Sequence, residues 1–272
     1  MALVRRLIRS LHAARNLGNP LHVLRKRAFG HPGDTMLVRD RRTGIHCACA
    51  VAAYPMFAST WYSHDYDVPR VPIGPGDVVF DIGAHQGFFS CYAAQRDARV
   101  FAFEPNPESF ARLLENVEAN GLSDRVVAKP WAIGAQDGTA ELLVSEELGG
   151  GMTTLLPTFA ENPHVSIRER LAVPCHTLPQ VLDMAAPARV RLCKIDAEGS
   201  ELDILRPLEP RHLAIVDSFV IEPHPEAYPL PALLDLIATW GTHQAALREP
   251  SEFSVMILRV VANRIAQKTS QQ

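Results

Sequence analysis

Residues 78–87, with the sequence VVFDIGAHQG, constrain what this chain can fold into more than any other segment. A short apolar strand runs into an acidic residue, Asp81, and then into two glycines, Gly83 and Gly87, that open a helix. The backbone of such a segment turns tightly and passes close to a ligand at the carboxyl end of a buried parallel strand. The segment therefore predicts a nucleotide-type cofactor site.

A second acidic residue follows the next apolar strand, residues 100–103, in the sequence EPNP. An ionised carboxylate at Glu104 can accept hydrogen bonds from both hydroxyls of a ribose. Ala132 and Ile133 end the third strand, and we expect them to pack on an adenine. These neighbouring strand ends predict one adenosyl ligand that lies across them.

The position of Asp81 narrows the choice of cofactor. Dinucleotide-binding strands carry a glycine at this place because a pyrophosphate settles on the helix N-terminus. A carboxylate there would repel a pyrophosphate, which disfavours a nicotinamide cofactor, but it suits a ligand with a cationic amino acid part. S-adenosyl-L-methionine fits, since it carries an ammonium and a sulfonium and no phosphate.

Strands and helices alternate along the chain from residue 78 onward. Predicted strands at 78–82, 100–103, 126–132, 190–195 and 219–222 are separated mostly by helical segments, and residues 243–247 and 253–261 form a terminal hairpin. This order predicts an α/β, Rossmann-like fold: a seven-stranded, mostly parallel sheet with helices on both faces and an antiparallel C-terminal hairpin. Residues 1–65 are expected to form an N-terminal extension of helices and paired strands for substrate or dimer contacts, and residues 66–272 the cofactor-binding domain.

Composition bounds the class of protein. With 272 residues, 47% of them apolar, the chain is long enough for one well-cored domain with additions. The net charge of −3 gives no overall attraction to nucleic acid or to an anionic membrane, although the first thirty-three residues hold several arginines and no acid. No apolar run approaches the ~20 residues that span a bilayer. We therefore expect a cytoplasmic protein that acts on a small molecule, with no nucleic acid partner and no membrane span. The basic N-terminal segment could form the interface of a homodimer.

Charged residues gather at the ends of two later strands. The sequence KIDAEG at residues 194–199 places Lys194, Asp196 and Glu198 after a buried strand, and Glu222 and His224 follow the next one. Burying charged groups costs several kcal/mol unless they are paired, so the cluster is a candidate catalytic site. The alternatives are a Lys194 ion pair that only braces the loop and a solvated His224. Asp196 and Glu198 offer oxygen ligands to a divalent cation, but no Asp-Asn pair follows at the next strand end, so we predict no metal.

With these residues together, the chain resembles the FkbM family of S-adenosylmethionine-dependent methyltransferases. The resemblance rests on DIGAxxG at residues 81–87, FxFEPNP at 101–107 and KIDxEGxE at 194–201, together with Asn116, Asn120 and the sequence AIG at 132–134. It implies a seven-stranded Rossmann-like methyltransferase fold and O-methylation of a small molecule, often a natural-product or sugar hydroxyl. The family commonly has Asn where this chain has His85, and Tyr-Glu where it has Tyr66 and Asp67.

The resemblance assigns the cofactor to Asp81, Gly83, Gly87 and Glu104, and it carries the acids of the third motif over to Asp196 and Glu198. The full set of predicted cofactor contacts adds neighbouring motif positions and the adenine contacts: Asp81, Gly83, His85, Gln86, Gly87, Glu104, Pro105, Asn106, Ala132, Ile133 and Asp196.

The implied reaction is an in-line displacement in which an acceptor oxygen attacks the sulfonium methyl. An alcohol must also lose a proton, and we expect His224 or Asp196 to accept it. Lys194, Glu198 and Glu222 complete the predicted catalytic group. Two rival interpretations are an RNA methyltransferase, suggested by the basic N-terminal segment and Lys194, and a non-catalytic subunit that binds the cofactor without consuming it.

Overall fold

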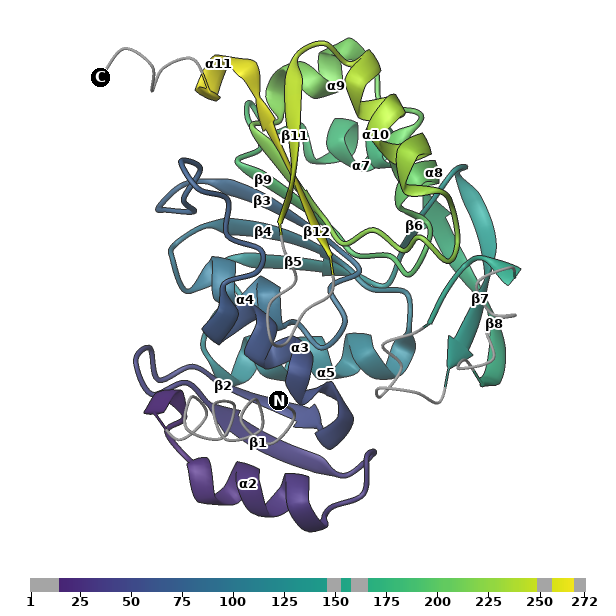
Figure 1. Ribbon diagram of the computed structural model, residues 1–272. Coiled ribbons are helices and arrows are strands. Elements are labelled where there is room, and N and C mark those ends of the chain that lie inside the picture. Colours follow the sequence, from purple (N-terminus) through teal and green to yellow (C-terminus); the bar gives the residue numbers. More distant parts are fainter. Residues whose placement is uncertain (1–14, 146–152, 158–165, 249–255, 267–272) are drawn as a thin grey trace.

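A computed structural model describes residues 15–145, 153–157, 166–248 and 256–266. Its main sheet has seven strands in the order β11-β12-β10-β9-β3-β4-β5 (Figure 1). The parallel strands are β3 (Val78–Ile82), β4 (Arg99–Phe103), β5 (Val126–Lys129), β9 (Leu192–Ile195) and β10 (Ser218–Ile221). β12 (Ile257–Ala262) runs antiparallel to both β10 and β11 (His243–Arg248). The predicted sheet and its antiparallel C-terminal hairpin are confirmed.

Helices cover both faces of this sheet (Figure 1). On one face lie α4 (Phe88–Ala94) and α5 (Pro107–Ala119), and on the other α7 (Leu178–Ala185), α8 (Glu201–Leu205), α9 (Pro210–Ile215) and α10 (Leu230–Thr239). Alternate residues of a strand point to opposite faces, so Val79 belongs to the first core and Phe80 and Ile82 to the second. Burial on both faces explains why the parallel strands read as continuous apolar runs.

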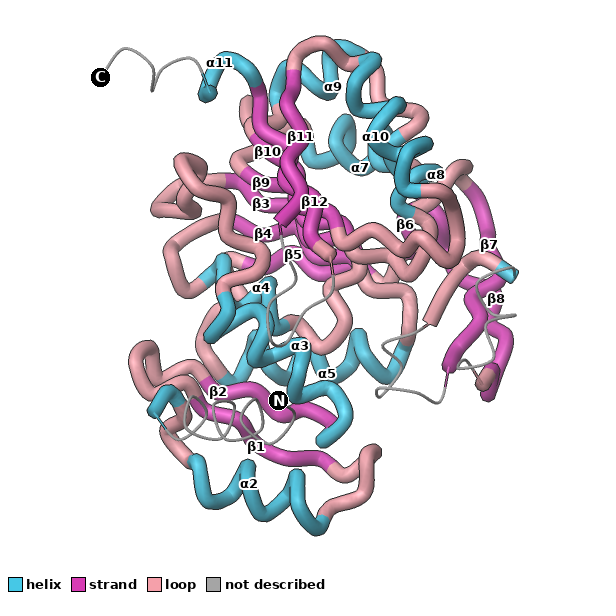
Figure 2. The backbone as a smooth tube through the Cα atoms, viewed as in Figure 1, coloured by secondary structure: helices cyan, strands magenta, loops and turns pink. Residues whose placement is uncertain are grey.

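The predicted strand at residues 126–132 is wrong in one respect. β5 ends at Lys129, and Pro130 follows it; a proline supplies no N–H to continue a ladder. Beyond this break, β6 (Ala132–Ile133) leaves the main sheet and pairs with β8 (Ile167–His176), which also pairs with β7 (Gly138–Ser145). A separate three-stranded sheet therefore stands beside the strand ends of the main sheet (Figure 2).

The N-terminal extension forms a layer beneath α5. It contains α2 (Pro20–Phe29), β1 (Thr35–Arg39) and β2 (His46–Ala50), followed by a helical stretch through α3 (Tyr54–Ala58) that the sequence analysis did not predict. The predicted strand pair is confirmed as an antiparallel ladder. Residues 1–14 of the predicted extension lie outside the described residues.

Two asparagines of α5 attach this layer to the rest of the molecule. The Asn116 amide accepts a hydrogen bond from the Ala48 N–H at 2.7 Å and donates one to the Ala48 carbonyl at 3.0 Å. Asn120 makes the same pair of bonds to His46, at 3.0 and 2.7 Å. These side chains bond the edge of β2 as a neighbouring strand would, and the extension shares one hydrophobic core with α4 and α5. The division at residue 65 remains a prediction about function, because packing is continuous across it.

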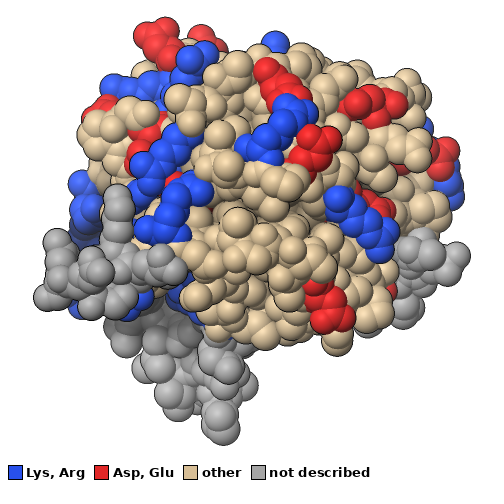
Figure 3. All heavy atoms as spheres, turned by 90° about the horizontal axis from the view of Figure 1, so that it is seen from above, with Lys and Arg blue, Asp and Glu red and all other residues tan. Residues whose placement is uncertain are grey.

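The surface carries charges of both signs. In the view from above, basic and acidic side chains lie intermixed (Figure 3), and several form exposed pairs such as Arg211 with Asp183. Within the described residues, no helix combines the length and the apolar character needed to cross a bilayer.

Candidate functional site

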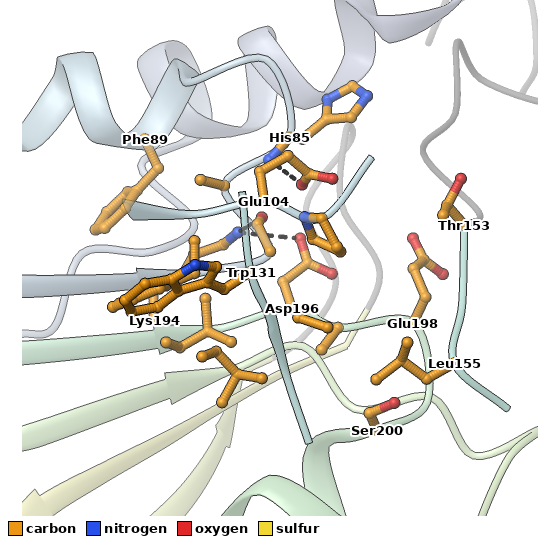
Figure 4. Close-up of a pocket in the computed structure, with 18 of the residues that line it drawn as sticks. His85, Phe89, Glu104, Trp131, Thr153, Leu155, Lys194, Asp196, Glu198 and Ser200 are labelled. Carbon is orange, nitrogen blue, oxygen red and sulfur yellow. Dashed lines mark hydrogen bonds and ion pairs between the residues drawn. The ribbon is translucent and has the colours of Figure 1, made fainter. Parts of the chain in front are cut away.

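A pocket opens at the carboxyl ends of β3, β4 and β9, where the predicted cofactor residues meet (Figure 4). The predicted residues that line it are Gly83, His85, Glu104, Pro105, Ala132, Ile133, Lys194, Asp196 and Glu198. Parallel strands bring their carboxyl ends to one edge, so residues more than 100 positions apart in the sequence become neighbours there.

Glu104, the predicted ribose contact, lines the pocket and is held by two backbone N–H groups. Its Oε2 accepts a hydrogen bond from the backbone N–H of His85 at 2.7 Å, and its Oε1 accepts one from the N–H of Asn106 at 2.8 Å. Burial raises the pKa of Glu104 to about 7, although both N–H donors oppose the rise. Each oxygen keeps a further lone pair, so the fixed carboxylate can still receive two ribose hydroxyls.

The turn after β3 contains two residues with a positive φ, Gly83 and His85. Gly83 has a φ of +71°, and a Cβ built on it would overlap the carbonyl oxygen of Asp196. His85 also has a positive φ, of +49°. Asn, Asp and His are the non-glycine residues found most often in that region, which explains why His85 can stand where the family commonly has Asn.

Asp81 lies beneath this turn rather than in the pocket. It is fully buried, accepts a hydrogen bond from Ser90 Oγ at 2.6 Å and pairs with Lys194 Nζ at 3.3 Å. Lys194 Nζ in turn donates to the Gly83 carbonyl at 2.7 Å. Both oxygens of the Asp81 carboxylate have protein partners, Ser90 and Lys194. This geometry does not favour the predicted direct contact of Asp81 with the cofactor. The observed role of Asp81 is to hold Lys194 under the glycine turn.

The surroundings of Lys194 keep it charged. Burial alone would lower its pKa, but Asp81 and Asp196 together raise the pKa above its ordinary value. Its ammonium also pairs with Asp196 at 3.4 Å. Lys194 therefore fits the alternative of a brace better than a group that exchanges protons.

Three other predicted cofactor residues stand behind the pocket wall. The Gln86 side chain accepts from the N–H of Ala50 at 3.3 Å and so belongs to the attachment of the N-terminal layer. Asn106 caps α5 through the N–H of Glu108 at 3.0 Å. Gly87 begins α4 with a φ of +81°. None of the three lines the pocket, and the local structure accounts for each residue type.

Acidic residues also gather after β9 and β10. His224 lies between two of them, with Nε2 3.2 Å from Glu198 and Nδ1 2.9 Å from Glu201. Burial alone would lower the pKa of His224, but Glu201 and Glu198 raise it well above its usual value. The alternative of a solvated His224 is wrong, since its side chain is only 13% exposed.

Tyr66 joins Glu222 to this acidic group. Its hydroxyl lies 3.0 Å from Glu222 and 3.3 Å from Asp196. Burial, and then the charge of Asp196, raise the pKa of Glu222 to about 8. Glu222 and His224 do not line the pocket themselves, whereas Tyr66, Asp196 and Glu198 do.

Several residues that line the pocket were not predicted from the sequence. Trp131, which stacks on Phe103, precedes the predicted adenine contacts and could have been found as their neighbour. Thr153 and Leu155 come from the long loop after β7, and Thr154 Oγ1 donates to the Glu198 carbonyl at 2.7 Å. Met56 and Thr60 come from the N-terminal layer. Nothing in the sequence places these distant segments against the pocket.

The family assignment rests on a direct match. A family model described as "Methyltransferase FkbM domain" matches residues 81–237. The chain belongs to the FkbM methyltransferase family. It is thus a methyltransferase, and its cofactor is S-adenosylmethionine.

Individual relatives extend the match over more of the chain. Methyltransferase sdnD from Sordaria araneosa is 24% identical over 82% of this chain and 96% of its own length. The 31-O-demethyl-FK506 methyltransferase FkbM from Streptomyces tacrolimicus is 28% identical over 72% of this chain and 84% of its own. Among solved structures, a methyltransferase FkbM from Methylobacillus flagellatus covers 95% of this chain and 60% of its own, with 15% identity and a TM-score of 0.47.

Proposed function

We propose that this FkbM-family methyltransferase transfers the methyl group of S-adenosylmethionine to a hydroxyl of a small molecule. The observation that carries the proposal is that one pocket is lined by Glu104 and also by Asp196 and Glu198. The first carboxylate suits a ribose, and the second pair suits an acceptor that must lose a proton. The relative from Streptomyces tacrolimicus, whose name gives an O-demethyl substrate, supports an oxygen acceptor.

The reaction needs little chemistry from the chain itself. When bound, S-adenosylmethionine would supply a methyl group activated by its sulfonium: the acceptor oxygen would form the new bond to the methyl carbon as the carbon–sulfur bond breaks, and the neutral thioether S-adenosylhomocysteine would be released. Positioning of the two reactants supplies much of the rate. The acceptor proton passes to a carboxylate, which adds on the order of 10²–10⁴-fold.

Asp196 is the better candidate for this proton acceptor. Its carboxylate lines the pocket, whereas His224 does not and has both ring nitrogens directed at Glu198 and Glu201. Of the two bases predicted from the sequence, we therefore retain Asp196.

The N-terminal layer is part of the proposed acceptor site. Met56 and Thr60 lie on the pocket wall with the aromatic residues Tyr66, Phe88 and Phe89. A largely apolar wall in the same pocket as two carboxylates suits a hydroxylated molecule with a hydrophobic body. This arrangement supports the predicted use of residues 1–65 for substrate contacts; the homodimer and the cytoplasmic location remain predictions.

Mass spectrometry tests the proposed function. Purified protein is incubated with S-adenosylmethionine and a cell extract, and the products are searched for a metabolite that gains one methyl group on oxygen. A chain that binds the cofactor but never consumes it across a broad acceptor panel would be the non-catalytic subunit instead. Methyl transfer to RNA alone, in a parallel incubation with total RNA, would support the rival RNA methyltransferase.

A further inference from the structure

Asp196, Glu198 and His224 come together beside the pocket from the ends of two neighbouring strands. One potential ligand atom of each, a carboxylate oxygen or an imidazole nitrogen, lies within 4.8 Å of the other two. Asp196 and Glu198 line the pocket, and Figure 4 shows both side chains beside it on the segment that follows β9. We propose that this cluster binds a divalent metal ion at the pocket wall.

A buried carboxylate orients His224 for such a role. Glu201 is fully buried, and its Oε1 lies 2.9 Å from Nδ1 of His224. The same oxygen accepts the N–H groups of Ala197 and Gly199, so it is held in place by the loop that carries Glu198. Metal-binding histidines usually donate their second ring N–H to a carboxylate, which sets the tautomer and the ring orientation. With Nδ1 of His224 directed at Glu201, Nε2 faces the Glu198 carboxylate at 3.2 Å. An ion bound by His224 and Glu198 would lie between these two groups.

The charges around the cluster favour a cation. The network contains five carboxylates, those of Asp81, Asp196, Glu198, Glu201 and Glu222, against two basic side chains, Lys194 and His224. S-adenosylmethionine adds only one net positive charge. Buried charges of one sign are costly unless they are paired or coordinate a metal, so a divalent ion would remove most of the remaining surplus.

A second observation points to a ligand on the same wall. Ser200 lies two residues after Glu198, lines the pocket and is only 2% exposed, yet its hydroxyl has no hydrogen-bond partner among the described residues. Buried hydroxyls are nearly always hydrogen-bonded. This hydroxyl is therefore suited to a polar group brought into the pocket, such as an acceptor oxygen or a metal-bound water.

The donor set indicates the kind of ion. Carboxylates suit Mg²⁺ and Mn²⁺, whereas imidazole suits Zn²⁺ and its first-row neighbours. A mixed set of two carboxylates and one imidazole therefore favours a first-row transition ion, such as Mn²⁺ or Zn²⁺. The sequence predicts no metal because the next strand end lacks an Asp-Asn pair. That strand end instead supplies His224 as a third potential ligand.

The role of the ion rests on the proposed function. An acceptor hydroxyl bound to the ion would have a lower pKa, so it would lose its proton more readily to the Asp196 oxygen that does not bind the ion. Its oxygen would then form the new bond to the methyl carbon as the carbon–sulfur bond breaks. Binding of the ion itself needs no acceptor and can be tested alone.

Mn²⁺ binding to the purified full-length chain tests the site. The loss of the electron paramagnetic resonance signal of free Mn²⁺ and calorimetric titration both report binding in the absence of an acceptor. We expect one ion per chain, at least about tenfold weaker binding in Glu198→Gln and His224→Ala, and unchanged binding in Glu118→Gln, which removes an exposed acid of α5.

The outcomes are distinct. No binding to the unaltered chain, or equal affinity in all four proteins, overturns the metal site. Glu198→Gln keeps the size of the side chain and remains informative should His224→Ala fail to fold. S-adenosylmethionine binding is measured in the same samples: a chain that binds the cofactor but not Mn²⁺ overturns only the metal site, and one that binds Mn²⁺ but not the cofactor overturns only the proposed function.

Discussion

Gly83 packs so closely against Asp196 that a single added carbon on Gly83 would overlap the Asp196 carbonyl oxygen. Gly83 directly follows β3 and Asp196 directly follows β9, and these two strands are adjacent and parallel. Gly83 belongs to the predicted cofactor turn, and Asp196 is the proposed proton acceptor. The contact therefore sets the distance between these two parts of the pocket.

Gly83→Ala should weaken cofactor binding and destabilise the protein. A positive φ on a non-glycine residue costs about 1–3 kcal/mol, and the overlap with Asp196 forces the loop after β9 to move. Gly121→Ala is the matched control, because Gly121 has a similar φ of +65° with open space around it. Thermal unfolding and calorimetric titration with S-adenosylmethionine measure both effects. Equal behaviour of the two variants would show that the contact does not matter.

Glu104→Gln should weaken S-adenosylmethionine binding by about 1.5–3 kcal/mol, the value of hydrogen bonds to a charged group. The amide keeps the shape of the side chain but offers only one oxygen acceptor to the ribose and the two backbone N–H groups. Glu118→Gln, on the exposed face of α5, should leave the affinity unchanged. Titration calorimetry compares the two, and an unchanged affinity in Glu104→Gln would remove Glu104 from the cofactor site.

The affinity for S-adenosylmethionine should rise with pH up to about 7. Burial raises the pKa of Glu104 from 4.5 to about 7 in the cofactor-free protein, and the ionised form is the one that accepts both ribose hydroxyls. Below this pKa, binding must first release a proton, so the affinity contributed by Glu104 falls up to tenfold per pH unit. The free energy of unfolding of the cofactor-free protein changes in the opposite direction. Because the pKa of Glu104 is raised on folding, its contribution to stability is fully present below about pH 4.5 and is lost as the pH rises to about 7.

Titration calorimetry across about pH 5.5 to 8.5 checks the pH dependence. The variant Glu104→Gln should lack the Glu104 component while keeping any contribution from other groups. If the affinity for S-adenosylmethionine changed equally with pH in the unaltered protein and in Glu104→Gln, Glu104 would not be the group responsible.

Asn116→Ala should destabilise the attachment of the N-terminal layer. It removes the bonds to both backbone groups of Ala48 and to the Gln86 carbonyl, which lies 2.8 Å from the Asn116 amide nitrogen. Leaving buried polar groups unpaired costs about 1–3 kcal/mol each before relaxation. Asn120→Ala should cost less, because Asn120 is only half-buried. Chemical denaturation measures the two losses, and limited proteolysis shows whether the region around β2 becomes accessible first.

The sequence by itself determined the sheet and the chemical identity of the pocket. Strong apolar runs separated by capped helices predict parallel strands, and Glu104 and Asp196 follow such runs directly. Their place at the carboxyl edge follows from strand direction alone. Local patterns therefore sufficed wherever the residue and its structural cause lie in the same strand or turn.

Only the tertiary structure decided which motif residues line the pocket. Asp81 and Gln86 stand within the cofactor motif, yet Asp81 is occupied by Ser90 and Lys194, and Gln86 bonds the backbone of the N-terminal layer. Their motif spacing does not reveal these partners, because the partners come from other elements. The end of β5 is a further example, since Ala132 and Ile133 pair with a strand that begins more than thirty residues later.

The same reason explains the acidic residues at the pocket. Tyr66 meets Glu222 across 156 positions of the chain, and His224 lies between Glu198 and Glu201 from a different strand end. The sequence supplies these residue types, but their roles depend on distances that only the packing of the sheet sets. A carboxylate next to a tyrosine, a histidine or a metal ion has different chemistry in each case, and sequence position alone does not distinguish them.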